Sequence, residues 1–342
     1  MVARIIAAFA LDAVAGEPPE ALHAVRWMGK LAEVLDRSLP GRRRAPVARA
    51  TGAAVALTLP VGVYLAARGL LKTLPRPLSG AAEVALLWVS LSARSLSDGG
   101  RAVAAALDGD GDVDGGGSVE ARGGINGGVG IDGGGSIEAG RGAVSRRVGR
   151  DTCGMDEEEV VRAAVESVAE NANDGVVAPM FYGFVGGAPL ALAYKMVNTL
   201  DSMIGYRNSR YADFGWAAAR LDDAAGYLPA RLTAAAVMAA SPAVGGSAAY
   251  SWRVWHREAA AHDSPNAGVC EGAFAGALGV RLGGDNTCGG RVVRKAVLGR
   301  GNRAPGRDDI ARSAALMYGA SLLFLGVAAA CRWTWDRGRR GR

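Results

Sequence analysis

The feature that most constrains this chain is the clumping of its apolar residues into long uncharged runs. Four such runs occupy residues 50–67, 176–194, 232–252 and 313–331. Each is close to the ~20 residues that an α-helix needs to cross the ~30 Å hydrocarbon core of a bilayer. A water-soluble enzyme rarely carries several such runs, so the sequence predicts a membrane protein rather than a pair of soluble domains.

The pattern of apolar residues favours helices over strands. No segment alternates between apolar and polar residues with the period of two that marks a half-buried strand. We therefore expect an all-α fold, a polytopic helical integral membrane protein with about four to six membrane-embedded helices and polar helical loops. The run 176–194 contains Pro179, Pro189 and several glycines, so we expect a broken or re-entrant helix that lines a cavity or lies buried in protein.

Polar helices are predicted between the apolar runs. Residues 157–172 should form one, because Asp156 followed by Glu159 has the pattern of a capping box. A second helix is expected over about 214–225, because a glycine and then a proline follow it. Both predicted helices carry clusters of charged residues.

The positive charge of the chain is local. The formal net charge is +6 at pH 7, and the surplus arginines lie at 37–49 and 332–342. Arginines that flank apolar spans are typical of the cytoplasmic ends of transmembrane helices, whereas a nucleic-acid binder spreads its basic residues over a folded surface. We therefore expect the lipid bilayer as a partner, and no nucleic acid. Four cysteines without a C-x-x-C pair favour neither a disulfide framework nor structural zinc.

A glycine-rich segment at 108–142 divides the chain. It contains a near-duplicate, DGGGSVEA at 114–121 and DGGGSIEA at 132–139, and its low apolar content predicts disorder. We expect N-terminal membrane helices over 1–107 and a region of catalytic loops and membrane helices over 143–342. The two regions should form a single functional domain.

The densest polar cluster is ESVAENAND at 166–174. Glu166 and Glu170 are four residues apart and share a helix face, and Asp174 follows just past the predicted helix. Carboxylates at this spacing suit Mg²⁺, which takes one or two carboxylates together with substrate phosphates. The alternative interpretation is that these residues form a solvated helix face. If only the two glutamates were present, this interpretation would be favoured.

A second cluster, residues 198–223, borders the broken run. Its Asn198 and Asp201 share a helix face, and its Arg207 and Arg220 can clamp phosphate or carboxylate groups. Ionisable groups near membrane depth are costly, so their presence favours a functional site. The alternative is a set of interfacial salt bridges.

Two turns that carry cationic side chains complete the candidates. One follows His262 and could present main-chain N–H groups to an anion. The other surrounds His23 and Arg26. For lone histidines the alternative is simple packing. The sequence contains no P-loop, nucleophile-elbow or zinc-protease motif, so the residues alone predict a helical membrane protein with polar loops suited to Mg²⁺ and phosphate.

Several of these segments resemble one known family. The similar segments are 11–37, 143–152, 163–234 and 262–284, and the most specific run is NTLDSMIGYRN at 198–208. They are similar to the CobD/CbiB family, the adenosylcobinamide-phosphate synthases of cobalamin biosynthesis. The resemblance covers most of the chain outside the glycine-rich segment, which is not part of the family pattern, and the C-terminal tail.

The resemblance implies a multi-pass enzyme of the cell membrane, an ATP-dependent amide ligase. Such an enzyme joins the free carboxylate of adenosylcobyric acid, a corrinoid, to the amine of aminopropanol or its O-phosphate, with ATP and Mg²⁺. Because the reaction uses ATP, the active site should face the cytoplasm. Other late membrane enzymes of the cobalamin pathway are candidate partners.

An amide ligase must activate a carboxylate and neutralise a transferring phosphoryl group, and Mg²⁺ and arginines do so electrostatically. On that basis we expect three sets of site residues. The expected metal ligands are Glu166, Glu170, Asp174 and Asp201. The expected catalytic residues are Asp201, Arg207, Arg220, Lys195 and His262. The expected substrate-binding residues are His23, Arg26, Asn198, Asn208, Asp222, Asp223 and Asn266.

Two other functions stay open at this point. The spacing Asn198-x-x-Asp201 resembles that of Mg²⁺-dependent membrane transferases of the UbiA kind, although these require a further Asp where Gly205 stands. A permease could place its substrate at the broken run 176–194, although a permease needs paired broken segments in two halves, and the sequence offers a single one.

Overall fold

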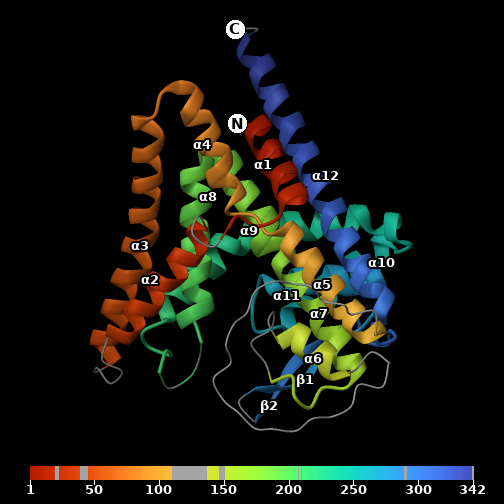
Figure 1. Ribbon diagram of the computed structural model, residues 1–342. Coiled ribbons are helices and arrows are strands. Elements are labelled where there is room, and N and C mark those ends of the chain that lie inside the picture. The colour runs from red at the N-terminus through yellow and green to blue at the C-terminus, as the bar shows by residue number, and fades with distance from the viewer. Residues whose placement is uncertain are drawn as a thin grey trace.

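The computed structural model describes residues 1–19, 23–38, 45–109, 137–145, 151–206, 208, 210–288 and 291–340. Helices dominate the described residues, as Figure 1 shows. They are α1 (Val2–Ala15), α2 (Ala24–Ser38), α3 (Ala45–Thr73), α4 (Arg76–Trp88), α5 (Ala93–Asp108), α6 (Ile137–Ser145), α7 (Glu157–Ala172), α8 (Ala178–Ile204), α9 (Trp216–Ala240), α10 (Ala248–Glu258), α11 (Ala267–Leu278) and α12 (Arg307–Arg340). The expected helical fold class is confirmed.

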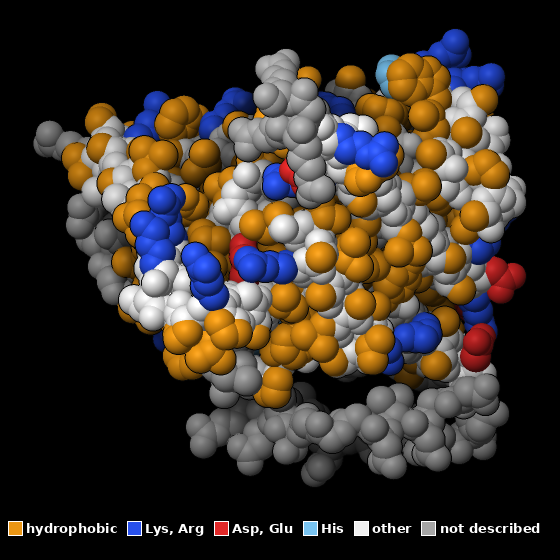
Figure 2. Space-filling model, turned by 90° about the horizontal axis from the view of Figure 1, so that it is seen from above, with side chains coloured by type: hydrophobic (Ala, Val, Ile, Leu, Met, Phe, Trp, Pro, Cys, Tyr) orange, Lys and Arg blue, Asp and Glu red, His pale blue; other side chains and the backbone are white. Residues whose placement is uncertain are grey.

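Three stretches among the described residues are long and apolar enough to cross a membrane. They are Ala45–Thr73, Glu157–Ile204 and Arg307–Arg337, and they contain three of the four apolar runs. On α3, Leu57 and Leu65 are 60% and 59% exposed, which suits contact with lipid. Hydrophobic side chains also predominate on the face that Figure 2 shows, where acidic side chains are sparse. The chain is therefore an α-helical membrane protein.

The fourth apolar run, 232–252, is not one helix, and the expectation of a span there is wrong. Helix α9 ends at Ala240, a 3₁₀ turn η3 (Ser241–Val244) follows, and α10 begins at Ala248. Gly245 has a left-handed backbone at φ 71°, and a Cβ atom at Gly246 would lie 1.9 Å from the carbonyl oxygen of Ala277. These two glycines let the chain turn closely against α11.

Helix α9 is longer than the sequence predicts, because it passes through both expected stop signals. A Cβ atom at Gly226 would lie 2.6 Å from Asn266 Nδ2, so this glycine serves close helix packing instead of ending the helix. Pro229 lacks an N–H and cannot pair with the carbonyl of Ala225. The hydroxyl of Tyr182, on α8, donates to that carbonyl at 2.8 Å instead.

The path from α7 to α8 agrees with the sequence at both ends. The capping box is present: Asp156 accepts from the N–H of Glu159, and Glu159 accepts from the N–H of Asp156. A π-helical turn η2 (Asn173–Val177) joins α7 to α8. Within α8 the backbone is non-helical at Gly186 and Gly187, so the expected break in the run 176–194 is confirmed.

The described residues include an antiparallel hairpin that the sequence analysis did not predict. It is formed by β1 (Leu282–Cys288) and β2 (Arg291–Leu298). Strand β1 contains few residues that favour strands, and Gly283 and Gly284 both have positive φ. The hairpin depends on contacts with α7: the N–H of Gly283 donates to Glu166 Oε1 at 2.7 Å, and Arg162 donates to the carbonyl of Asp285.

The glycine-rich segment 108–142 is only partly within the described residues. Residues 110–136 lie outside them. The last part belongs to α6, which packs against α5 and α7. A Cβ atom at Gly140 would lie 2.6 Å from a methyl group of Leu107. The expectation of disorder is therefore wrong for residues 137–142, because these residues bury a helix face.

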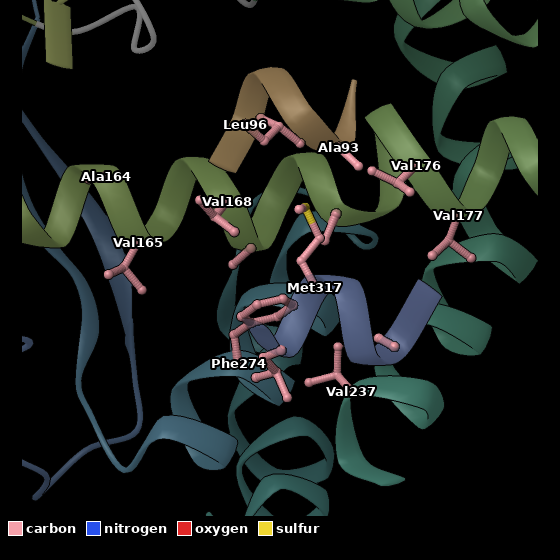
Figure 3. Close-up of a cluster of buried hydrophobic side chains, with 14 of the residues drawn as sticks. Ala93, Leu96, Ala164, Val165, Val168, Val176, Val177, Val237, Phe274 and Met317 are labelled. Carbon is pink, nitrogen blue, oxygen red and sulfur yellow. The ribbon is translucent and has the colours of Figure 1, made fainter. Parts of the chain in front are cut away.

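One hydrophobic core joins helices from both halves of the chain. Figure 3 shows α7 with α5 on one side and with α9, α11 and α12 on the other, and Phe274 and Met317 point toward α7. Leu96, Val168, Phe274 and Met317 are all buried in this core. Burying each such side chain contributes about 1.5–3 kcal/mol. This packing fixes the two ends of α7, and with them the polar turn η2.

We predict that Tyr182→Phe lowers the free energy of unfolding by about 1 kcal/mol, because the carbonyl of Ala225 then loses its donor. In a Pro229→Ala background residue 229 regains an N–H, so the same change should cost much less. Unfolding in detergent micelles measures both values. Tyr227→Phe, at an exposed tyrosine on α9, is the control. An equal cost in both backgrounds would contradict the assignment.

Candidate functional site

A small polar cavity lies where α7, η2, α8 and α9 meet the start of α11. Its volume is about 110 Å³. The residues that line it are Glu170, Asn173, Asp174, Asp201, Asp222, Ser264, Asn266, Ala267 and Cys270. Four of these side chains are carboxylates, and they come from segments up to 52 residues apart in sequence, since Glu170 is on α7 and Asp222 is on α9. The cavity therefore gathers several of the site residues expected from the sequence.

Asp174 is held by three side-chain hydrogen bonds. Its Oδ1 accepts hydrogen bonds from Asn173 Nδ2 at 2.7 Å and from the hydroxyl of Tyr194 at 3.2 Å. Its Oδ2 accepts from Asn198 Nδ2 at 3.2 Å. Asp174 lies in the π-helical turn, and such turns are frequent at functional sites. The turn aims this carboxylate at the cavity.

Asn198 links the carboxylates of two helices. Its Nδ2 donates to Asp174 Oδ2 and also lies 3.4 Å from Asp222 Oδ1. Burial raises the pKa of Asp222 well above its usual value, and the nearby carboxylates of Asp174 and Asp201 raise it further. Like charges gathered in a partly dehydrated cavity repel one another. The arrangement thus favours a bound cation.

The fit of Mg²⁺ to the cavity follows from the donor set. Carboxylate and amide oxygens are hard ligands of the kind that Mg²⁺ takes. Within the described residues, no three His, Cys, Asp or Glu side chains are placed to hold one metal ion together. An ion here would therefore take one or two carboxylates and complete its shell with water or phosphate oxygens, as is usual for Mg²⁺. The residues fit the ion in that form.

Glu166 does not reach this cavity. The residue is 1% exposed, and its carboxylate accepts from the N–H of Gly283, so it anchors the hairpin. Four-residue spacing placed Glu166 and Glu170 on one helix face, but only Glu170 lines the cavity. The expectation that four carboxylates, Glu166 among them, surround one ion does not match this geometry.

The part of the cavity wall formed by Asn266 is held by an arginine that the sequence analysis missed. Arg231 donates to Asn266 Oδ1 at 3.0 Å and to the carbonyl of Pro265 at 3.2 Å, and its guanidinium lies 3.5 Å from the ring centroid of Tyr227. Asn266 Nδ2 in turn donates to the carbonyl of Asp223 at 2.9 Å. The spacing of Tyr227 and Arg231, four residues apart on α9, was the available signal.

The expected site residues His262, Asn208, Arg220 and Asp223 do not line the cavity. His262 is buried beside Glu271, 3.7 Å away, and burial lowers its pKa, with the charge of Lys295 adding to the effect. Asn208 Oδ1 accepts from the main-chain N–H groups of residues 210 and 211. Arg220 is exposed and lies 3.9 Å from Asp223.

The N-terminal turn forms an ion cluster of its own. Glu17 lies 3.5 Å from His23 and 4.0 Å from Arg26. The hydrogen bond with His23 is the main reason that the pKa of Glu17 falls to about 2. The charge of Glu17 also acts on Lys195, so this turn lies near the polar part of α8.

Arg207, which we expected at phosphates, lies outside the described residues.

Cys270 is a further cavity residue that the sequence analysis did not select. Burial raises the pKa of its thiol well above the usual value, and the nearby carboxylate of Asp174 adds to this. The thiolate is the nucleophilic form of cysteine. Cys270 is therefore held as a neutral thiol that packs beside the carbonyl of Ala230.

Comparison with known proteins gives one consistent result. The sequence pattern of the CobD/Cbib protein family matches residues 5–122 and 128–317. A cobalamin biosynthesis protein CobD from Geobacter metallireducens is 42% identical over 329 residues, which are 95% of each chain. Another CobD, from Yersinia enterocolitica, is 39% identical over 322 residues, or 93% of each chain. A cobalamin biosynthesis protein CbiB from Salmonella typhi is 37% identical over 331 residues, or 95% of each chain. No solved structure matches this chain.

The family match spans the cavity and two of the three membrane-length stretches, and it ends at residue 317 within the third. Between residues 5 and 317 it is interrupted at 123–127, so it extends into the glycine-rich segment 108–142 that we expected to stand outside the family pattern. The match covers every residue that lines the cavity. Family match and nearly full-length relatives agree, and the chain belongs to the CobD/CbiB family.

Proposed function

We propose that this chain acts in cobalamin biosynthesis as an ATP-dependent amide ligase. It joins the free carboxylate of adenosylcobyric acid to the amine of aminopropanol or its O-phosphate. The names of the relatives support the pathway, since they are called cobalamin biosynthesis proteins. The observation that carries the reaction type is the cavity, in which carboxylates from α7, η2, α8 and α9 meet amide side chains.

The size of the cavity limits what it can take. Pockets for drug-sized ligands have volumes of about 300–1,000 Å³, whereas this cavity has about 110 Å³. It suits the reacting carboxylate, amine and phosphate groups, and the corrinoid ring stays outside it. A wide and partly apolar ring suits the membrane surface between helices, and because the proposed reaction uses ATP we propose that the active site faces the cytoplasm.

The residues of the cavity divide the work. One or two of the four cavity carboxylates, Glu170, Asp174, Asp201 and Asp222, would hold Mg²⁺, which when bound neutralises charge on the phosphates of ATP. Asn198 presents an amide donor beside Asp174 and Asp222, and Asn266, whose Nδ2 donates to the main-chain carbonyl of Asp223, lines the cavity; both would orient the reacting groups. Positioning and charge neutralisation are most of what phosphoryl transfer asks of a protein. The lipid bilayer holds the enzyme, and other late membrane enzymes of the pathway are proposed partners.

The geometry speaks against a UbiA-like transferase. That class requires a second Asp four residues after Asp201, where this chain has Gly205. A Cβ atom at Gly205 would lie 1.8 Å from Asp201 Oδ1, so the position has no room for a side chain.

The direct test of the ligase is to incubate the purified protein with adenosylcobyric acid, ATP, Mg²⁺ and aminopropanol phosphate. Mass spectrometry should then detect the heavier amide product, with aminopropanol tested in parallel.

We predict that Asp174→Asn and Asp201→Asn each lower kcat by two or more orders of magnitude, because electrostatic stabilisation is usually the largest catalytic contribution. Both changes keep the shape of the side chain and remove its charge. Asp213→Asn is the matched control, since Asp213 pairs with Arg49 at 2.9 Å and does not line the cavity. Near-normal turnover of both site variants at saturating Mg²⁺ would refute the assigned role.

A second prediction concerns the intermediate. With Cys270 held as a neutral thiol, we expect Cys270→Ser to keep kcat within about threefold, because no acyl-thioester forms on the enzyme. The carboxylate would instead attack the γ-phosphorus of ATP, release ADP and form an acyl phosphate, which the amine then converts to the amide and inorganic phosphate.

Heavy oxygen in the corrinoid carboxylate distinguishes activation as an acyl phosphate from activation as an acyl adenylate. The label should appear in inorganic phosphate, with ADP as co-product. Label in AMP, accompanied by pyrophosphate, would replace the acyl phosphate with an acyl adenylate and leave the ligase proposal intact. Loss of activity in Cys270→Ser with normal folding would favour the thioester path.

A further inference from the structure

Pro179 creates a local problem beside the cavity. It stands at the start of α8, directly after the π-helical turn η2 that carries Asp174. Proline has no main-chain N–H, so residue 179 cannot donate to the carbonyls four and five residues before it. These are the carbonyls of Gly175 and Asp174. Buried main-chain carbonyls almost always have a donor, so other groups must supply the missing hydrogen bonds.

Two groups from outside η2 supply them. The main-chain N–H of Ser92, in the break between α4 and α5, donates to the carbonyl of Gly175 at 3.0 Å. The ammonium of Lys195, further along α8, donates to the carbonyl of Asp174 at 3.2 Å. The consecutive carbonyls of Asp174 and Gly175 are thus each held by a donor from outside the turn.

Lys195 is placed for this task rather than for contact with a substrate. Its side chain is not among those that line the cavity, whereas the Asp174 side chain is. The charges of Asp174, Asp222 and Glu17 act on its ammonium group, and such pairing is what makes a buried cation tolerable. The ammonium faces the back of the turn, and the Asp174 carboxylate faces the cavity.

We propose that Lys195 is a positioning residue for the ligase reaction proposed here: its ammonium replaces the N–H that Pro179 lacks and so holds the Asp174 carboxylate in the cavity. The proposal differs from the expectation that Lys195 contacts the reacting groups. It predicts that what matters at residue 195 is a hydrogen-bond donor, and that a donor restored at residue 179 can substitute for it.

Four variants of the full-length protein in detergent test this proposal. Lys195→Met removes the donor at similar length and should lower kcat on the order of 10²-fold, because a small misplacement of a catalytic group has such effects. Lys195→Gln keeps an N–H donor without the charge and should recover most of that loss. Pro179→Ala restores the main-chain N–H and should be near wild type alone. The double variant, which carries both Lys195→Met and Pro179→Ala, should have a kcat at least tenfold higher than that of Lys195→Met alone.

Lys30→Met, which removes an exposed lysine on α2, controls for loss of one positive charge. The apparent KM for aminopropanol phosphate should stay within about threefold in every variant, since Lys195 does not touch that substrate. Equal inactivity of Lys195→Met and Lys195→Gln, without rescue by Pro179→Ala, would overturn the proposal. It would indicate that the positive charge of Lys195 acts directly on the reacting groups. Normal activity of Lys195→Met would overturn it as well.

Thermal unfolding of the same variants keeps this test separate from the ligase assignment. The loss of thermal midpoint caused by Lys195→Met should shrink when Pro179→Ala is present, whatever reaction the protein performs. If the wild-type protein forms no amide product but this coupling is found, the ligase proposal fails and the pairing of Lys195 with Pro179 stands. Additive losses of midpoint would contradict the pairing.

Discussion

A buried main-chain carbonyl that loses its helical partner costs about 1–3 kcal/mol, and this penalty shapes the helices around the cavity. Among the prolines within or beside these helices, Pro179 and Pro229 each remove one donor. The penalty is met by neighbours: Tyr182 donates to Ala225 on α9, and Ser92 and Lys195 donate to the turn η2. Each substitute donor ties two segments together, so the irregular backbone specifies which segments meet.

Burial also explains the electrostatics of the cavity. Carboxylates from several segments face a space of about 110 Å³, and like charges at such range disfavour joint ionisation. Amide side chains, such as Asn198 between Asp174 and Asp222, offset part of that cost. The remaining negative charge is what a magnesium ion bound to phosphates would balance. Folding and function thus draw on one electrostatic arrangement.

Sequence spacing predicted which side chains lie together where the residues follow one another on a helix. Asn198 and Asp201 share a face of α8, and Asp174 follows α7, so spacing brought them together correctly. Spacing failed at Glu166, because the hairpin β1–β2 covers that side of α7 and takes up the carboxylate through Gly283. It also missed Arg231, whose role depends on the turn at Pro265 and Asn266 packing against α9.

The sequence alone determined that the chain is helical and enters a membrane, because uncharged runs of membrane length leave few other folds. It also determined the capping box of α7 and the break within α8, which depend on residues close together in the chain. Only the tertiary structure decided that 232–252 turns back instead of crossing, that α9 continues through Gly226 and Pro229, and that β1 forms a strand. In each case a residue that is distant in sequence, Ala277, Tyr182 or Glu166, supplies the packing contact or hydrogen bond. Such a contact cannot be predicted from the residues of the segment itself.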